Sequence, residues 1–258
     1  MHNIGLKIWS TNFDCYAKDA VDFCRKGICS YVELYVVPET LETLKLWKSL
    51  DVPYTIHCPH SAHGFNLSRK ELRETNREIY LETKQFADEL NADFIIFHGG
   101  MSGEIEETAA QLKDFCEPRA LIENKPYKAI PGFYAEGITC VGYSPEQIAY
   151  IMKTAGCGFC LDFNHAVCAA NSLKKGIYEE LSSYISLNPT MYHVSDLSDE
   201  NTEFDEHLNL GKGVLDLKRF MSLLPDNYKA SLETKKNFKS SLSDFYEDVV
   251  YFKSLFER

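Results

Sequence analysis

A short apolar run followed by an amphipathic helical stretch recurs eight times along this chain of 258 residues. Brief apolar runs between turn signals indicate buried strands, and apolar residues spaced three or four apart indicate helices. Strands are predicted at Ile4–Trp9, Tyr31–Val37, Tyr54–His57, Phe94–His98, Ala120–Glu123, Gly158–Phe163, Met191–Val194 and Ala230–Glu233. Helices are predicted at Tyr16–Cys24, Leu41–Leu50, Arg69–Leu90, Glu104–Phe115, Pro145–Ala155, Lys174–Leu187, Leu217–Leu224 and Leu242–Phe256.

Eight strand–helix units in a chain of this length favour a (β/α)8 TIM barrel, an α/β fold that takes about 250 residues. Residues 1–258 are expected to form this barrel as a single domain. A doubly wound open sheet is the alternative, but it usually has fewer strands, and no G-x-G-x-x-G follows the first predicted strand. In a barrel the carboxyl ends of all strands meet at one face, where active sites are built.

Composition limits the partners that the protein can have. The chain carries 27 Lys and Arg against 38 Asp and Glu, a net charge of −11, so a broad nucleic-acid-binding face is not expected. No apolar run reaches the roughly 20 residues of a membrane helix, which predicts no membrane partner. The nine cysteines are an odd number without a signal peptide, which predicts free thiols and a cytoplasmic location.

Histidines gather at one end of the predicted strands. Seven of the eight lie at, or just after, the carboxyl end of a strand: His57, His60, His63, His98, His165, His193 and His207. Carboxylates occupy similar positions at Glu123, Asp162, Asp205 and Glu233. When imidazoles and carboxylates gather at one end of a barrel, bound protons or cations are needed to balance the charges of the carboxylates and to pair with the imidazoles. Mixed nitrogen and oxygen ligands suit zinc, manganese or iron, so the pattern predicts a divalent-metal site.

The segments around these residues resemble the superfamily of endonuclease IV and xylose isomerase-like barrels, AP endonuclease family 2. They are IHCPHSAHGFNL, FIIFHGG, LIENKP, CLDFNHA, YHVSD, FDEHLNLGKG and SLET. Endonuclease IV binds three zinc ions through nine ligands, and the resemblance implies a bridging role for the counterpart Glu123. The nine implied metal ligands are His57, His98, Glu123, Asp162, His165, His193, Asp205, His207 and Glu233.

The first ligand of this set has two candidates. His57 fits an H-x-P motif at the end of its predicted strand, which puts it at the mouth of the barrel. His60 keeps the family's spacing to Asn66, so it is the alternative first ligand. His63 and Asn66 are expected to belong to a substrate loop after this strand.

One hypothesis for the reaction is sugar isomerisation or epimerisation. By resemblance, such an enzyme would hold one metal with Glu123, Asp162, His193 and Glu233, and His165 would touch the substrate. The catalytic residues would then be Glu123 and Glu233, which move a proton beside a carbonyl group, together with His165.

The competing hypothesis is a metal-dependent hydrolase of phosphoesters. His57, His98 and the Asp205/His207 pair exceed what a one-metal isomerase needs, and they suit two or three zinc ions, with manganese as the alternative metal. A metal-activated hydroxide would attack the phosphoester. The sequence favours this hydrolase over the isomerase. A barrel that binds metal or sugar without catalysis is a third hypothesis.

Duplex DNA is not the expected substrate. By resemblance, endonuclease IV carries an Arg-rich recognition loop after the second strand, whereas this chain has VVPETLETLKLWKSLDVP, without arginine. His63 also replaces an aromatic residue that the family places in the DNA. A small phosphoester or a sugar-derived substrate is therefore expected instead.

Three further positions are assigned to the surroundings of the site. Tyr127 lies in the long stretch Asn124–Ser144, which is either a lid over the substrate or a surface elaboration. Lys212, between two glycines, either presents a cation and backbone amides to a phosphate or belongs to a plain turn. Asp196, three residues after His193, is expected to orient a metal ligand from behind.

Overall fold

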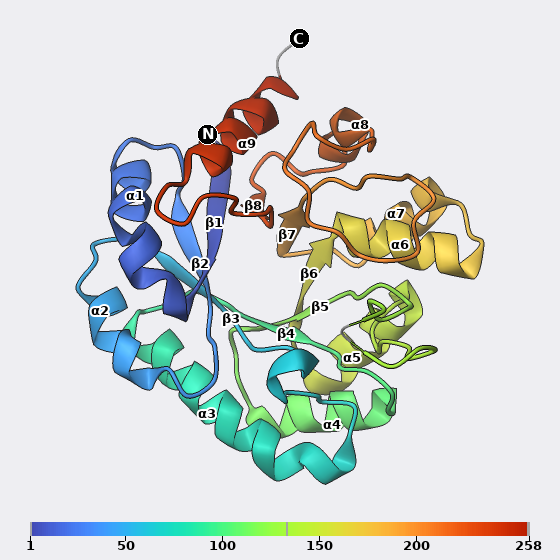
Figure 1. Cartoon of the computed structure of the whole chain (residues 1–258). Helices are drawn as coiled ribbons and strands as arrows, with labels where there is room; N and C mark the ends of the chain where they lie inside the picture. Colours follow the sequence, from blue (N-terminus) through green and yellow to red (C-terminus); the bar gives the residue numbers. More distant parts are fainter. Residues whose placement is uncertain (1, 133, 257–258) are drawn as a thin grey trace.

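The computed structural model describes residues 2–132 and 134–256, and its strands close into one parallel barrel (Figure 1). Each strand pairs with the next in the chain, and β8 closes on β1 from Asn3↔Lys229 to Leu6↔Leu232. The prediction of a (β/α)8 barrel is confirmed. The strands are β1 (Asn3–Trp9), β2 (Tyr31–Tyr35), β3 (Tyr54–His57), β4 (Ile95–His98), β5 (Ala120–Glu123), β6 (Gly158–Asp162), β7 (Met191–Val194) and β8 (Lys229–Leu232).

The helices lie outside the strands and bury their apolar faces against them (Figure 1). They are α1 (Phe13–Arg25), α2 (Leu44–Lys48), α3 (Arg73–Glu89), α4 (Ile105–Phe115), α5 (Pro145–Ala155), α6 (Phe163–Leu173), α7 (Ile177–Ile185), α8 (Leu217–Met221) and α9 (Ser243–Ser254). None of the helices in the described part of the chain is both long and apolar enough to cross a membrane. All nine cysteines are free thiols, as predicted.

Helix α6 differs from the sequence prediction, which had the sixth strand continue to Phe163 and placed no helix between that strand and Lys174. The strand ends at Asp162, whose Oδ1 accepts the backbone N–H of His165 at 2.8 Å and caps the helix. Every residue from Phe163 to Ala170 is buried. A helix buried on all sides has no apolar stripe, so periodicity could not reveal it.

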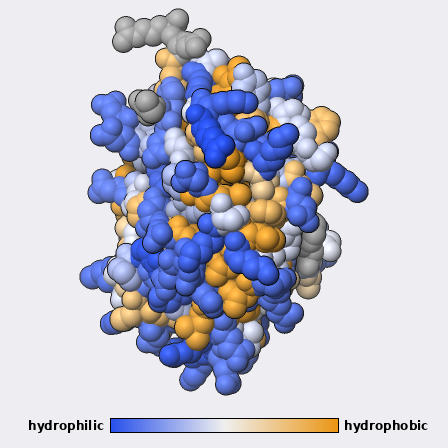
Figure 2. All heavy atoms as spheres, turned by 90° about the vertical axis from the view of Figure 1, so that its left-hand side faces the viewer, coloured by the Kyte–Doolittle hydropathy of each residue, from blue (hydrophilic) through white to orange (hydrophobic). Residues whose placement is uncertain are grey.

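The exterior is mostly polar. Figure 2 shows the side of the molecule that carries α1 and α2, where hydrophilic side chains predominate and apolar ones are visible between them. Leu46 of α2 and Leu81 of α3 are among the exposed apolar side chains. Exposed leucines of this kind are common on folded proteins.

The barrel interior has an apolar part and a charged layer. Alternate residues of a strand face the interior, so residues two apart occupy successive layers. The apolar part consists of Tyr31, Ile96, Leu121, Cys160 and Met191, all buried. Two residues further along β2, β4, β5, β6 and β7, a charged layer contains Glu33, His98, Glu123, Asp162 and His193. Strand register pairs these positions across the sheet, as in His98↔Glu123 and Asp162↔His193.

Gly5 of β1 lies where the barrel interior leaves no room for a methyl group. A Cβ at this position would lie 2.3 Å from the Tyr31 ring and 2.5 Å from Ser231 Oγ. These two side chains are hydrogen-bonded to each other at 3.0 Å, so neither can move away freely. We expect Gly5→Ala to lower the free energy of unfolding by about 1–3 kcal/mol.

Urea denaturation measures this change. Leu81→Ala is the control, because this exposed leucine should alter stability by no more than about 0.5 kcal/mol. Equal unfolding midpoints for Gly5→Ala and the wild type would contradict the close packing of β1 against β2 and β8.

Candidate metal centre

The carboxyl ends of the strands open into a cavity of about 710 Å³. Its walls combine histidines, carboxylates, lysines and aromatic rings that come from distant parts of the chain. The imidazoles and carboxylates among them are His57, His60, His63, His98, His165, Asp205, His207 and Glu233. The cavity therefore lies at the face where the sequence located the site.

All nine predicted metal ligands fall into three of the four groups of potential metal donors at this end of the barrel, and the fourth joins His57 and His193 to Glu33. Within a group, one donor atom of each residue lies within 4.8 Å of the others. The groups are His57 with His98 and Glu123, then Glu123 with Asp162, His193 and Glu233, and then His165 with Asp205 and His207. Glu123 belongs to the first two groups, and its Oε1 lies 2.9 Å from Nδ1 of His165 in the third.

The spacing within the groups fits metal coordination. Zinc ligands at 2.0–2.1 Å in tetrahedral arrangement lie roughly 3.3 Å from one another. In the first group, Glu123 Oε2 lies 3.1 Å from His57 Nε2 and 3.0 Å from His98 Nε2. In the second, His193 Nδ1 lies 3.0, 3.5 and 3.9 Å from oxygens of Glu233, Glu123 and Asp162. Each group therefore has the dimensions of a coordination sphere.

Several donor atoms are buried without a hydrogen bond to any part of the chain that the structure describes. In the second group they are Asp162 Oδ2, His193 Nδ1 and Glu233 Oε2. In the third they are Asp205 Oδ1 and His207 Nδ1. Burying polar atoms without a hydrogen-bond partner costs free energy of folding. A bound divalent cation would satisfy them, so the donor set fits a metal site.

Hydrogen bonds behind the rings decide which nitrogen faces each group. Nδ1 of His57 donates to the Cys58 carbonyl at 2.8 Å, and Nδ1 of His165 donates to the Asn124 carbonyl at 2.8 Å. Both rings therefore keep Nε2 as an electron-pair donor. His193 has the opposite arrangement, because its Nε2 donates to Glu33 and leaves Nδ1 for the second group.

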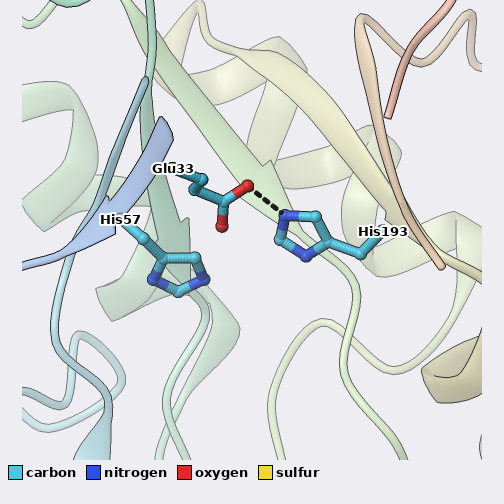
Figure 3. A group of neighbouring side chains, drawn as sticks. All are labelled: Glu33, His57 and His193. Carbon is cyan, nitrogen blue, oxygen red and sulfur yellow. Dashed lines mark hydrogen bonds and ion pairs between the residues drawn. The ribbon is translucent and has the colours of Figure 1, made fainter. Parts of the chain in front are cut away.

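Glu33, which the sequence reasoning missed, is the carboxylate behind His193. Its Oε2 accepts from His193 Nε2 at 3.0 Å, and Figure 3 shows the carboxylate pointing to that ring. Burial alone would raise the pKa of Glu33, but His193 and Lys7 outweigh it and lower the pKa to about 2. A carboxylate that accepts from a ligating histidine fixes its ring and raises its basicity. The available signal was one glutamate within the otherwise apolar strand YVELY.

Lys7 of β1 was also missed. Its Nζ lies 2.6 Å from Glu233 Oε1 and 3.4 Å from Glu33 Oε1. Burial opposes its charge, but Glu233 and Glu33 outweigh burial and raise its pKa. Lys7 therefore holds Glu233 in the second group and balances part of the negative charge there.

His60 and His63 lie beside the three groups rather than in them. Nδ1 of His60 accepts from the Ala62 amide at 3.2 Å and caps the short 3-10 turn Ser61–His63. Burial, followed by the charge of Lys125, lowers the pKa of His60 to about 3. His63 Nδ1 is hydrogen-bonded to the Tyr35 hydroxyl at 2.7 Å. Of the two candidate first ligands, His57 is thus the one that contacts Glu123.

Three residues assigned to substrate contacts do not line the cavity in the described structure. Asn66 Oδ1 accepts from the Met101 amide at 3.0 Å and ties the loop after β3 to the loop after β4. The Tyr127 ring packs edge-on against Tyr143 at 4.8 Å. Lys212 belongs to an exposed turn, in which its N–H donates to the Asn209 carbonyl at 3.1 Å. In this structure their contacts are with neighbouring loop residues, which sequence position alone did not indicate.

Asp196 does not orient His193, because Glu33 makes that contact instead. Its carboxylate accepts four backbone N–H groups at 2.9–3.1 Å, from Leu197, Gly211, Gly213 and Leu215. Asp196 therefore holds together the loop that carries Asp205 and His207, and it acts on the site only through that loop.

Removing the charge behind His193 should weaken metal binding. We expect Glu33→Gln to lower zinc affinity about 10–100-fold, because changes directly behind metal ligands have effects of this size. Titration against a chromogenic chelator measures the affinity. Glu42→Gln, at an exposed position, is the control and should bind as the wild type does. Unchanged affinity in Glu33→Gln would show that Glu33 does not support the ligand ring.

Known proteins share this fold and part of this sequence. The family model of the xylose isomerase-like TIM barrel matches residues 19–243. A probable endonuclease 4 of Persephonella marina is 26% identical over 189 residues, which cover 66% of this chain and 65% of that protein. The match thus spans slightly less than two thirds of that relative's length.

Two solved structures illustrate the range of proteins with this fold. Endonuclease IV from Thermus thermophilus has a TM-score of 0.69 and 19% identity, with 99% of both chains covered. A D-tagatose 3-epimerase-like protein has a TM-score of 0.67 and 16% identity, with 98% of both chains covered. The family match extends over most of the barrel and confirms the resemblance drawn from the sequence motifs. The chain belongs to the xylose isomerase-like TIM-barrel family.

Proposed function

We propose that the protein is a metal-dependent hydrolase of small phosphoesters with two or three bound zinc ions. The observation that carries this proposal is the position of Glu123, whose carboxylate belongs to two neighbouring ligand groups. A one-metal isomerase needs only the group that contains Asp162, His193 and Glu233. His57 and His98 on the other side of Glu123 would be superfluous to it, whereas a multinuclear hydrolase uses them.

The chain's own residues would prepare the site for this reaction. Divalent ions bound there would lower the pKa of a water molecule toward neutrality and offset charge on phosphoryl oxygens. Glu123 directs Oε2 to His57 and His98 of the first group and lies 3.5 Å from His193 Nδ1 of the second, which suits a bridging ligand. Because Glu33 and Lys7 hold His193 and Glu233 from behind, little reorganisation would be needed when substrate arrives.

The cavity supports a small anionic substrate. Five lysines line the cavity, although the whole chain has a net charge of −11. These lysines are Lys7, Lys125, Lys128, Lys235 and Lys236. Its volume of about 710 Å³ is in the range of small-molecule sites. At its edge Trp9 is 45% exposed and packs beside Tyr35 with ring centroids 5.3 Å apart. This aromatic edge would suit the organic part of a phosphoester.

A sugar isomerase or epimerase is the second candidate function. The group Glu123, Asp162, His193 and Glu233 favours it, because two glutamates stand on either side of one potential metal position. Glu123 and Glu233 could then exchange a proton with a carbon beside a carbonyl. Incorporation of deuterium from heavy water into a panel of keto sugars tests this reaction directly.

The first ligand group separates the two functions. We expect the zinc-loaded protein to hydrolyse p-nitrophenyl phosphate or bis(p-nitrophenyl) phosphate, and to act poorly on a duplex containing an abasic site. His98→Ala should lower kcat/KM by more than roughly 100-fold, because even changes behind a metal ligand cost 10–100-fold. His2→Ala is the control, since His2 packs on Phe256 and Tyr228 away from the cavity.

Two outcomes would contradict the hydrolase. One is deuterium exchange into a sugar by both the wild type and His98→Ala, with no phosphoester hydrolysed. The other is full hydrolytic activity after removal of all metal by a chelator, with metal content checked by mass spectrometry.

A further inference from the structure

The third ligand group already contains a cation of the chain itself. The ammonium nitrogen of Lys125 lies 3.3 Å from His165 Nε2. This ring nitrogen also lies 3.2 Å from Asp205 Oδ2, within the group formed by His165, Asp205 and His207. Since Nδ1 of His165 donates to the Asn124 carbonyl, Nε2 is the ring nitrogen that faces this group. A metal ion bound to Nε2 would therefore lie close to the Lys125 ammonium.

The backbone holds Lys125 at this position. Its N–H donates to the Gly142 carbonyl at 2.9 Å. The side-chain amide of the preceding residue, Asn124, makes two hydrogen bonds to Asp162 at the end of β6. Its Oδ1 accepts from the Asp162 N–H at 2.8 Å, and its Nδ2 donates to the Asp162 carbonyl at 2.9 Å. The base of the Lys125 side chain is thus anchored between β5 and β6, directly beside the third group.

Lys125 differs in its partners from Lys7 and Lys128, two other lysines of the cavity. Lys7 forms ion pairs with Glu33 and Glu233, and Lys128 forms one with Glu203. Among the described residues, no carboxylate lies within 4.0 Å of the Lys125 ammonium. The Lys125 ammonium therefore lies beside the ring of His165 and the cavity without forming an ion pair within this distance.

We propose that Lys125 supplies the positive charge of the third group, so that the enzyme holds two metal ions tightly around Glu123 and a third only weakly. This inference rests on the proposed multinuclear site. A dication placed on His165 Nε2 would stand next to an ammonium, and like charges at such a distance repel each other. Lys125 would then be the cation that an anionic substrate meets on this side of the cavity.

Zinc stoichiometry tests the proposal. The wild type, Lys125→Met and Lys128→Met are loaded with excess zinc, dialysed against zinc-free buffer, and their zinc per chain is measured by plasma mass spectrometry. We expect two retained ions in the wild type and in the control Lys128→Met, and three in Lys125→Met. In competition titrations, the third ion should bind at least about tenfold more tightly to Lys125→Met, because the repelling charge is gone.

The remaining outcomes overturn the inference in distinguishable ways. Three retained ions in both the wild type and Lys125→Met would refute the role of Lys125 and leave the hydrolase proposal standing. Two ions in both would also refute it, because the third group would then be weak for another reason. At most one ion in the wild type would refute the multinuclear hydrolase itself, and the inference with it. Circular dichroism checks folding, and Lys125→Gln replaces Lys125→Met if that variant does not fold.

Discussion

A carboxylate buried at the centre of the barrel mouth determines most of what surrounds it. Glu123 has no exposed surface, and burial by itself would raise its pKa. The imidazoles of His98 and His193 outweigh burial and hold the pKa of Glu123 well below its usual range. A buried charge of this kind is tolerated only with positive partners. Bound cations are the partners that would also satisfy the unpaired nitrogen and oxygen atoms beside it.

Charge balance continues through the same layer of the barrel. Lys7 and Glu33 are neighbours in the register of β1 and β2, and both face the interior beside His193 and Glu233. On this side of the layer, Lys7 thus lies between two carboxylates, Glu33 and Glu233, and offsets part of their charge. The ring of His193 is fixed by this arrangement, so the ligand geometry depends on strands at the opposite end of the chain.

The donor groups of this barrel are compatible with both proposed reactions. In the isomerase proposal the group around Asp162, His193 and Glu233 would serve a proton transfer, and in the hydrolase proposal His57 and His98 would extend it to a multinuclear site. Lysines in the cavity and the aromatic edge at Trp9 are the features behind the proposal of a small anionic substrate. The short 3-10 turn and helix α2 that follow β2 carry little net positive charge with which to grip a nucleic acid backbone.

Local patterns in the sequence were sufficient for the barrel and for the face at which the candidate ligands gather, since strand ends in a parallel barrel must meet at one face. They were insufficient where contacts depend on register or loop packing. Glu33 and Lys7 lie in mid-strand, and only closure of the sheet brings them to His193 and Glu233. Asp196, three residues from His193, instead binds the amides of its own loop. Spacing along the chain determines which face a residue reaches, whereas its partners there come from distant segments that only the folded barrel brings together.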